Sequence, residues 1–482
     1  MYSLLPFQFG RVPARNVLVV NECGDHYFLA EEVFSSFIEH RMDESSDEFL
    51  DLKSKLFLYQ DDPELSLQKI AARYRTRKSF LREFTSLHML VVTLRCNQRC
   101  DYCQASSADE GASQFDMTSE TAFKIVDMVF RSPSRHPKIE FQGGEPLLNW
   151  TVIRDTVKYA ERKATETGKE ASFVVCTNLT AVTLDQLSFL RDHRVSISTS
   201  LDGPQCLHDM CRKTRQGGAT HAGFESKLEL ARGVLGNGSV NALMTTTAHT
   251  LGRMGEVTDE YLRLGMNGIF IRSLNPYGFA AEDARTLGYA SESFVDCYLK
   301  SLEYIFELNR NVYFPEYFAS LLFSRILTPY PTGFVDLQSP SGCGISGAIY
   351  DYDGSVFPSD EARMLARMGD RHFFLGNVLN DSFEDIFAGK KLRALTAGAC
   401  VETTPCCARC VYQAFCGTDP VRNYLETGDE LRSMECSPFC AKHKGVFNGL
   451  FRILKENDPF KLDVIWSWIT KNRFLVERHE NC

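Results

Sequence analysis

The order of hydrophobic and polar positions changes near residue 89. From there to residue 273, short apolar, β-branched runs alternate with segments whose apolar residues recur at helical spacing. The apolar runs predict six strands, at 89–94, 138–142, 172–176, 195–201, 240–246 and 268–273. Strands that alternate with helices favour a parallel sheet with right-handed crossovers. The pattern therefore predicts an α/β fold, a partial (βα)6 barrel of the TIM type.

The first 85 residues have a different pattern and predict a small α+β module, similar to a winged helix. "NVLVVNECGDHYFLA" indicates two short strands around a turn at Gly24 and Asp25. "EEVFSSFIEHRM" and "DEFLDLKSKLFLY" have the spacing of short amphipathic helices. The basic stretch "ARYRTRKSFLREF" then connects the module to the barrel, either as a solvated helix face or as a contact for an acidic peptide.

The alternation of strands and helices stops after residue 325. "LTPYPTGFVDLQSPSG" is rich in Pro, Gly and Ser and predicts a long loop. A cysteine-rich segment follows, and "VFNGLFRILKEN" spaces its apolar residues as one helix face for core packing. We expect four parts: a recognition module at 1–85, the barrel at 86–325, a cysteine-rich domain at 326–445 and a helical tail at 446–482.

Charge and composition exclude several classes of protein. The net charge of −9 over 482 residues argues against nonspecific binding to nucleic acid. No apolar run approaches the length of a bilayer span, and the N-terminus lacks the pattern of a secretion signal. We therefore predict a cytoplasmic protein with no membrane or nucleic-acid partner. In a reducing compartment its 17 cysteines favour metal ligands or buried thiols over disulfides.

Polar residues or glycines lie at, or directly after, the carboxyl end of each of the six predicted strands. In chain order they are Cys96, Cys100 and Cys103; Gly143, Gly144 and Glu145; Thr177 and Asn178; Ser198, Ser200 and Asp202; Thr245 to Thr247; and Arg272. In α/β barrels the carboxyl ends of the strands carry the active site. The sequence therefore predicts that these groups meet at one edge of the sheet.

The spacing of the three cysteines in "CNQRCDYC" narrows the chemistry. A structural zinc site needs four ligands, and no further Cys or His occurs in the 30 residues after Cys103. Ferredoxin patterns also supply four thiolates per cluster. Three thiolates on a four-iron cluster would leave one iron open to a small molecule. The competing hypothesis is that the three cysteines are close together by chance.

"CNQRCDYC", with "GGEP" about 40 residues later, resembles the radical S-adenosylmethionine (SAM) superfamily. The resemblance implies a [4Fe–4S] cluster on Cys96, Cys100 and Cys103 whose open iron is chelated by SAM, and cleavage of SAM to a 5′-deoxyadenosyl radical. It implies that Tyr102 lies against the adenine. The residues implied around the rest of SAM are Gly143, Gly144 and Glu145 at its amino group, and Asn178, Ser200, Asp202 and Arg272 at its ribose and carboxylate.

The C-terminal cysteines resemble a SPASM domain, an extension that carries auxiliary clusters. Ser359 and Pro420 stand where that family has two of its cysteines. The remaining set, Cys407, Cys410, Cys416 and Cys440, implies one auxiliary [4Fe–4S] cluster that removes an electron. Alternatives stay open: Cys436 in place of Cys440, a second cluster that uses Cys343, Cys400, Cys406 or Cys436, or a zinc ribbon.

Asp360 directly follows the replaced cysteine position at Ser359. In a sulfatase-maturing relative the residue after that cysteine removes a proton, so the resemblance makes Asp360 a candidate general base, with Glu361 as a second. The competing interpretation is a turn aspartate beside a glutamate that faces solvent.

"LHMLVVTLRCNQRCDYCQAS", "FIRSLNPYGFA" and "DGSVFPSDEARML" resemble the His-Xaa-Ser-system radical SAM maturases and the darobactin-type crosslinking maturases. This implies a ribosomal precursor peptide as substrate, with its leader added as a strand to the N-terminal module. It implies a C–C (cyclophane) or ether crosslink, and an electron donor such as flavodoxin or ferredoxin. The alternatives are Ser or Cys oxidation, thioether formation, and a non-catalytic zinc-binding scaffold.

Overall fold

The computed structural model describes residues 2–473 apart from 13–14, 61, 432–434 and 436. The chain forms two compact units. We call Arg82–Phe318 with Cys343–Thr396 the barrel unit, and Met1–Leu81 with Ala319–Gly342 and Ala397–Cys482 the terminal unit.

A nine-stranded sheet, in the order β13-β12-β10-β9-β8-β6-β14-β15-β16, forms the centre of the barrel unit. Six neighbouring strands are parallel: β6 (Leu87–Thr93), β8 (Lys138–Gly143), β9 (Ser172–Cys176), β10 (Ser196–Ser200), β12 (Val240–Thr245) and β13 (Ile271–Arg272). They coincide with the six strands predicted from the hydrophobic pattern. The predicted α/β fold is therefore confirmed.

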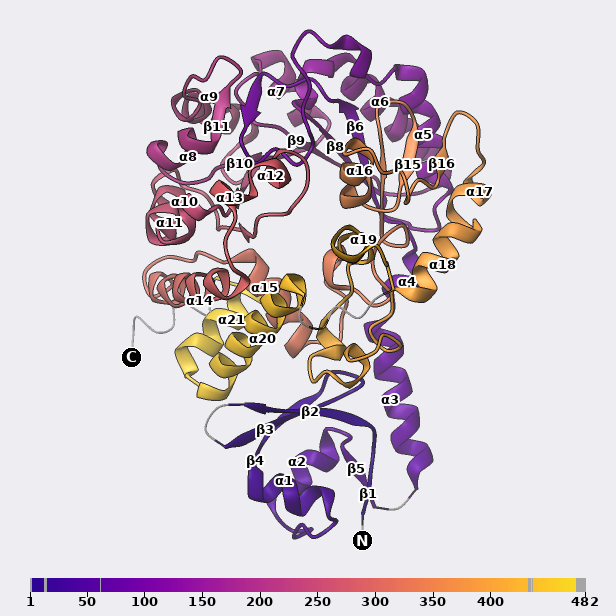
Figure 1. Ribbon diagram of the computed structural model, residues 1–482, viewed down its shortest axis with the longest axis vertical. Helices are drawn as coiled ribbons and strands as arrows, with labels where there is room; N and C mark the ends of the chain where they lie inside the picture. Colours follow the sequence, from indigo (N-terminus) through magenta and orange to yellow (C-terminus); the bar gives the residue numbers. More distant parts are fainter. Residues whose placement is uncertain (1, 13–14, 61, 432–434, 436, 474–482) are drawn as a thin grey trace. The chain divides into compact units, whose positions relative to one another are not determined.

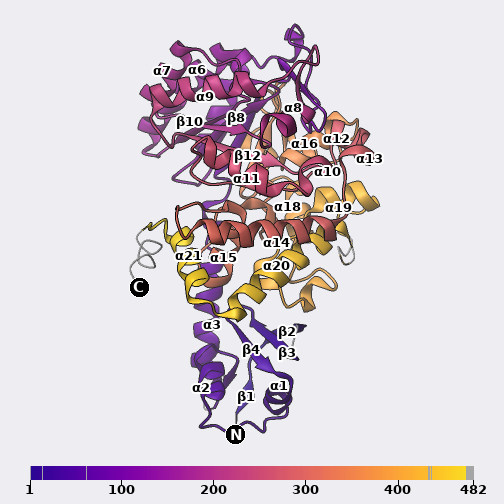
Figure 2. The same cartoon turned by 90° about the vertical axis from the view of Figure 1, so that its left-hand side faces the viewer.

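Amphipathic helices surround this sheet (Figures 1 and 2). Those between the parallel strands are α5 (Ser119–Arg131), α6 (Trp150–Thr167), α7 (Leu184–Asp192), α8 (Gln205–Cys211), α9 (His221–Leu235), α10 (Ala248–Leu251) and α11 (Met254–Arg263). The side chain of Thr118 caps α5 by accepting a hydrogen bond from the Thr121 amide at 3.1 Å. After β13 come α12 (Phe279–Glu282), α13 (Ala284–Leu287), α14 (Ser291–Leu308) and α15 (Tyr317–Leu327).

The cysteine-rich segment contributes strands to the same sheet, which the sequence did not predict. β14 (Gly347–Tyr350) pairs in parallel with β6, and β15 (Ser355–Phe357) and β16 (Gly376–Asn377) continue the sheet antiparallel. Strands of two to four residues are too short to show a periodic pattern. The helices of this segment are α16 (Asp360–Arg367), α17 (Phe383–Phe387) and α18 (Lys390–Gly398).

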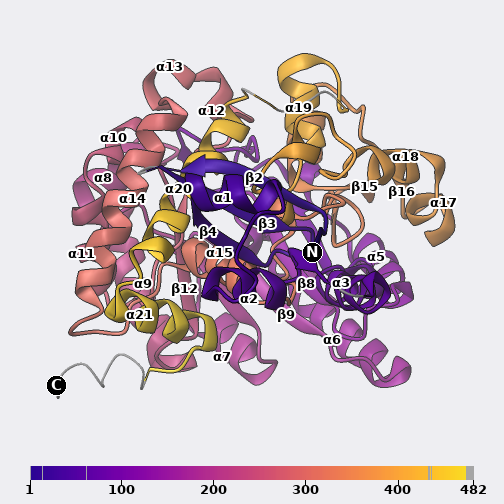
Figure 3. The same ribbon diagram turned by 90° about the horizontal axis from the view of Figure 1, so that it is seen from below.

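The N-terminal module of the terminal unit consists of a three-stranded antiparallel sheet, β2-β3-β4, a two-stranded sheet, β1-β5, and helices (Figure 3). Its elements are β1 (Ser3–Leu4), β2 (Phe7–Val12), β3 (Asn16–Asn21), β4 (His26–Ala30), α1 (Glu31–Ile38), α2 (Asp47–Ser54), β5 (Leu58–Tyr59), α3 (Pro63–Arg77) and α4 (Phe80–Glu83). The turn predicted at Gly24 is confirmed, with φ of 83°. The helix expected to run through "LFLY" ends at Ser54, because Leu58 and Tyr59 pair with β1. Most of the basic connector is helical.

The C-terminal part of the terminal unit consists of short turns followed by helices α19 (Pro420–Thr427), α20 (Pro438–Glu456) and α21 (Pro459–Thr470). Phe447 and Phe451 of α20 are buried and stack on Tyr412, at ring distances of 5.3 and 5.7 Å. The predicted apolar helix face is therefore confirmed. No helix in the described part of the chain is both long enough and apolar enough to cross a membrane.

Both positions at which a SPASM cysteine is replaced mark the start of a helix. Ser359 is the N-cap of α16, and its hydroxyl accepts a hydrogen bond from the Ala362 amide at 3.2 Å. Pro420 is the first residue of α19, which is capped by Asp419. Serine at the N-cap and proline at the first helical position both stabilise the start of a helix.

Candidate active site

The three N-terminal cysteines lie in the loop over residues 94–108, which we call the cysteine loop. Part of it, β7 (Gln98–Cys100), pairs antiparallel with β11 (Arg212–Thr214), which places Cys100 opposite Arg212. The Cys96 amide donates to the carbonyl oxygen of Ala108 at 3.1 Å. Arg215 Nε donates to the carbonyl oxygen of Cys96 at 2.7 Å. The backbone around the cysteines is therefore fixed by the barrel unit itself.

The thiols of the cysteine loop lie close enough for their charges to act on one another, with Cys96 buried and Cys100 and Cys103 half-buried. Burial raises the pKa of Cys96, and the neighbouring charges of Glu145, Cys100 and Cys103 raise it further. Burial likewise raises the pKa of Cys100 to about 12. Three thiolates placed here need a positive group between them, and the iron atoms of a cluster would supply it. The donor set thus fits a [4Fe–4S] cluster, although no group in the described residues is arranged to hold a single metal ion.

Gly143 and Gly144 let the second strand approach the backbone that leads into the cysteine loop. A Cβ on Gly144 would lie 2.5 Å from the carbonyl oxygen of Leu94, and Gly143 has a φ of 154°. The Gly144 amide donates to Thr93 O at 2.9 Å, and the Glu145 amide donates to Arg95 O at 2.7 Å. Only glycine fits this close contact. The expected contact of these residues with the SAM amino group stays a prediction.

Glu145 joins the ends of the second and third parallel strands. Its buried carboxylate accepts hydrogen bonds from the Thr177 hydroxyl at 2.7 Å and from the Asn178 amide at 2.8 Å. Burial raises the pKa of Glu145 to about 7. Asn178 Nδ2 donates to Asn97 Oδ1 at 2.8 Å and lies 3.9 Å from Cys96 Sγ. The structure thus brings Glu145 and Asn178 to the cysteine loop, as the sequence predicts.

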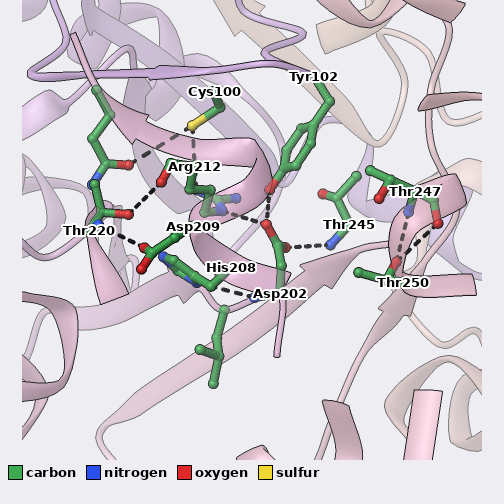
Figure 4. A network of polar contacts seen from close by, with 12 residues as sticks. Cys100, Tyr102, Asp202, His208, Asp209, Arg212, Thr220, Thr245, Thr247 and Thr250 are labelled. Carbon is green, nitrogen blue, oxygen red and sulfur yellow. Dashed lines mark hydrogen bonds and ion pairs between the residues drawn. The ribbon is translucent and has the colours of Figure 1, made fainter. Parts of the chain in front are cut away.

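Asp202 is the centre of a buried network that fixes Tyr102 (Figure 4). Its Oδ2 accepts hydrogen bonds from Arg212 Nε at 2.8 Å and from the Tyr102 hydroxyl, and its Oδ1 accepts from the Thr245 amide at 3.0 Å. The Arg212 guanidinium lies 5.3 Å from the centre of the Tyr102 ring. Burial opposes the charge of Arg212, but Tyr102 and Asp202 outweigh it and raise the pKa of Arg212. The Asp202 carboxylate is thus already engaged by protein groups and holds Tyr102 in place.

Sequence reasoning missed Arg212 and Gly278. Arg212 is opposite Cys100 only because β11 pairs with β7, which no local pattern signals. Gly278 lies in the quoted stretch "FIRSLNPYGFA", and a Cβ on it would lie 2.6 Å from the carbonyl oxygen of Cys103. Ser200 and Arg272, which end β10 and β13, lie at the carboxyl-end edge as predicted.

One face of the parallel sheet carries Glu140, Gln142 and Cys176, which the sequence analysis did not single out, beside Ser198, which it did. Glu140 alternates with the buried Phe141, and its Oε1 accepts hydrogen bonds from Gln142 Nε2 at 2.7 Å and Cys176 Sγ at 3.2 Å. The next strand places Ser198 beside Cys176 on this face. The signal was present as alternation in "KIEFQ", where a charged and an amide side chain share the face opposite the apolar one.

Asp360 lies away from the cysteine loop. The Gly344 amide donates to Pro358 O at 2.7 Å, so α16 begins near the start of β14, whose first residue pairs with the first residue of β6. That is the amino end of the parallel strands, opposite the cysteine loop. Asp360 Oδ1 lies 3.3 Å from Nε of the buried Arg363, and Glu361 is the next residue of α16.

The terminal unit gathers the four predicted auxiliary ligands. Burial and then the neighbouring thiols raise the pKa of Cys407 to about 11. The removal of Cys416 from water, and then the charges of Cys410, Cys407 and Cys440, raise the pKa of Cys416 to about 12. The Cys410 amide donates to Cys407 O at 3.0 Å. No disulfide links any two cysteines in the described part of the chain. Four thiols in mutual proximity fit an auxiliary cluster.

The alternative auxiliary ligands have different surroundings. Cys343 belongs to the barrel unit, at the start of the segment that leads into β14. Burial, and then the charge of Glu402, raise the pKa of the Cys400 thiol. Cys406 is the residue directly before Cys407, and its charge helps to raise the pKa of Cys407. Cys436 lies outside the described residues.

A parallel sheet with three neighbouring thiols after its first strand and a glycine pair after its second is typical of the radical SAM class of enzyme. Comparison with family models gives the same class, because residues 90–259 match the radical SAM superfamily. The chain carries a radical SAM domain and is a radical SAM enzyme homologous to the sulfatase-maturating enzymes. The prediction of a [4Fe–4S] cluster and SAM as cofactors is confirmed by this assignment.

One sequence relative and two solved structures show how far the similarity extends along the chain. The cysteine-type anaerobic sulfatase-maturating enzyme of Clostridium perfringens is 24% identical over 370 residues, which are 74% of this chain and 93% of the relative. The structure of native anSMEcpe with bound AdoMet matches with a TM-score of 0.63 at 20% identity, over 77% of this chain and 98% of that one. The structure of Streptococcus suis SuiB bound to the precursor peptide SuiA matches with a TM-score of 0.52 at 14% identity, over 90% and 98%. These structures confirm the partial-barrel fold.

Proposed function

We propose that this enzyme matures a ribosomally synthesised precursor peptide by closing a crosslink between two of its side chains. The observation that carries the proposal is that the N-terminal sheet and the four-cysteine segment form one compact unit. A peptide-recognition module and a candidate auxiliary cluster are therefore built as one body. The similarity to a sulfatase-maturating enzyme and to a structure with a bound precursor peptide supports a peptide substrate.

We assign the leader peptide to the free edge of β2. Among the described strands, β2 has β3 as its single neighbour, so its outer backbone groups can pair with an added strand. Phe9 of β2 is 56% exposed, and its ring lies 5.0 Å from that of Phe34. A bound strand would cover this aromatic surface.

The leader site can be tested by fluorescence anisotropy with a labelled precursor leader. Phe9→Ala should weaken binding at least tenfold, which corresponds to about 1.4 kcal/mol of lost burial. Leu50→Ala is the matched control, because Leu50 is 53% exposed on α2 of the same module. Equal affinities for all three proteins would place the leader elsewhere.

When bound, the cluster and SAM supply a 5′-deoxyadenosyl radical that takes a hydrogen atom from a substrate carbon. The residues of this chain position the reacting parts. Asp202 and Arg212 hold Tyr102, and Glu145 holds the third strand end beside the cysteine loop. The polar face around Glu140 offers acceptors and donors to a peptide side chain. Asp360, which pairs with Arg363 at the amino end of the parallel strands, is our candidate to accept the proton released when the new bond closes, from a part of the peptide that extends to that end of the sheet. The electron released with the proton would pass to the cluster proposed on Cys407, Cys410, Cys416 and Cys440.

Co-expression with a precursor peptide, to be sought among the genes beside that of this enzyme, tests the reaction. The expected product is lighter by two hydrogens, and tandem mass spectrometry should place the loss across two side chains. The variant in which Cys96, Cys100 and Cys103 are all alanine should leave the peptide unchanged. An unmodified precursor with the active enzyme would contradict the proposal.

Oxidation of a single Ser or Cys side chain is the second candidate, favoured by the similarity to a cysteine-type sulfatase-maturating enzyme. Oxidation of Ser removes the same two hydrogens but leaves an aldehyde. Oxidation of Cys removes two hydrogens to give a thioaldehyde, which water converts to the aldehyde with release of hydrogen sulfide. A hydrazine probe separates the two reactions, because it labels the aldehyde and leaves a crosslink unlabelled.

A further inference from the structure

A cavity of about 420 Å³ in the terminal unit is lined by more cationic than acidic side chains. Arg77, Lys78, Arg325, Glu402 and Cys416 are among the residues that line it. Cys416 is one of the four proposed auxiliary ligands. The charges of this cavity therefore bear on whatever Cys416 binds.

Two of the three cations are satisfied by protein groups. Lys78 Nζ forms an ion pair with Glu402 Oε1 at 2.6 Å. Arg77 donates to the carbonyl oxygens of Cys23 at 2.8 Å, Arg325 at 3.0 Å and Ala414 at 3.3 Å, so its donors are used by the backbone.

Arg325 differs from both. Its Nη1 is buried and has no hydrogen-bond partner in the described part of the chain. Burial, and then the charge of Arg77, lower the pKa of Arg325 to about 10, so the side chain stays protonated at neutral pH. A buried cation without an anion is strongly unfavourable. Two acids line this cavity: Glu402 is paired with Lys78, and Glu22 is exposed.

Cys416 lines the same cavity as Arg325, and the negative charge of its thiolate acts favourably on the Arg325 charge. The local framework keeps the two close: Arg77 donates to the backbone of Arg325 and of Ala414, and its guanidinium lies 5.5 Å from the ring centre of Phe415. The end of α15, which carries Arg325, is thus tied to the turn that ends at Cys416.

We propose that Arg325 is the counter-charge and positioning residue of the auxiliary cluster on Cys407, Cys410, Cys416 and Cys440. The inference rests on the proposed auxiliary cluster. A four-iron cluster with four thiolates is negatively charged, and reduction adds one more negative charge. A guanidinium beside it stabilises the reduced state more than the oxidised state, and its free N–H can donate to a cluster or cysteine sulfur. Arg325 would therefore raise the reduction potential of the cluster.

The test uses the full-length chain with Cys96, Cys100 and Cys103 replaced by alanine, so that any remaining cluster signal comes from the auxiliary site. Iron content is measured first, and about four irons are expected. A potentiometric titration followed by electron paramagnetic resonance then compares Arg325→Met with its parent. We expect at least a tenfold fall in the equilibrium constant for reduction, which is about 59 mV for one electron.

Two further variants make the result decisive. Arg325→Lys keeps the charge and should retain most of the potential. Arg452→Met removes an exposed arginine of α20 and should change nothing. If Arg325→Met loses its iron and Arg325→Lys keeps it, the need for the charge is supported. Loss of iron in both, or an unchanged potential in Arg325→Met, overturns the inference. A parent protein without iron instead overturns the auxiliary cluster.

Discussion

Replacing Asp202 by asparagine removes the negative charge at the centre of the buried network while keeping its shape. In Asp202 the Tyr102 hydroxyl and the Thr245 amide donate to different carboxylate oxygens. Asparagine has a single carbonyl oxygen and a donor-only NH2 group, so it can accept from one of these two donors but not from both. The Arg212 guanidinium, whose Nε lies 2.8 Å from Asp202 Oδ2, loses its anion in a site where only 10% of its side chain is exposed. The prediction is that this substitution destabilises the barrel unit and loosens Tyr102.

The magnitude follows from the geometry of the ion pair. Two unit charges 2.8 Å apart attract by about 6 kcal/mol at an effective dielectric constant of about 20. Part of this is retained by the asparagine carbonyl, and mutations that break a buried ion pair typically cost about 3–5 kcal/mol. A loss of that size lowers the Tm of a domain of this class by roughly 10 °C.

Thermal unfolding of the anaerobic protein, followed by circular dichroism, measures the change. Asp127→Asn is the matched control, because Asp127 is a half-exposed carboxylate of α5 that pairs with Lys163 at 3.1 Å. Loss of that surface ion pair should lower the free energy of unfolding by less than about 1 kcal/mol. The KM for SAM should rise in Asp202→Asn with little change in Asp127→Asn, because Tyr102 loses its anchor. Equal Tm values for both variants would refute the argument that the Asp202 charge stabilises the network.

Three further substitutions test other parts of the structure. Burial lowers the pKa of His88 from 6.5 to about 3, so neutral His88 stabilises the fold fully above pH 6.5, and this stabilisation is lost as the pH falls towards 3. Between pH 6.5 and 5 the free energy of unfolding should therefore decrease by about 2 kcal/mol less in His88→Gln than in the wild type, which Tm measured at each pH would show. Gly144→Ala should displace the backbone before Cys96 and lower the iron content, whereas Gly223→Ala, at an open site on α9, should not. Arg77→Ala should lower the Tm of the terminal unit by removing three backbone hydrogen bonds worth about 1 kcal/mol each, and an unchanged Tm would contradict this.

The parallel sheet could be predicted from the sequence because β6 is a continuous buried run, because β8, β9 and β10 alternate buried with less buried residues, and because helical patterns separate these strands. The edge at which Glu145 and Asn178 meet the cysteine loop followed from the parallel order of the strands. By contrast, β14 to β16 are too short to show a period, and their place beside β6 depends on pairing between residues more than 250 positions apart, such as His88 with Ala348. Local patterns carry no information about such contacts.

The site was predictable where a motif is local and unpredictable where it is assembled by the fold. The cysteine loop and the glycine pair are contiguous in sequence, so their spacing alone indicated the chemistry. Arg212 and Arg325 gain their importance from the side chains packed around them, Asp202 in one case and Cys416 in the other. Charged residues on otherwise ordinary helices and strands give no sign in the sequence that they will be buried.

The central claim is that Cys96, Cys100 and Cys103 hold a cluster at which SAM is cleaved. The most direct measurement is the formation of 5′-deoxyadenosine when the anaerobically purified protein is reduced with dithionite and mixed with SAM. The account predicts 5′-deoxyadenosine from the wild-type protein and none from the variant in which the three cysteines are alanine. A colourless, zinc-containing protein that leaves SAM intact would contradict it.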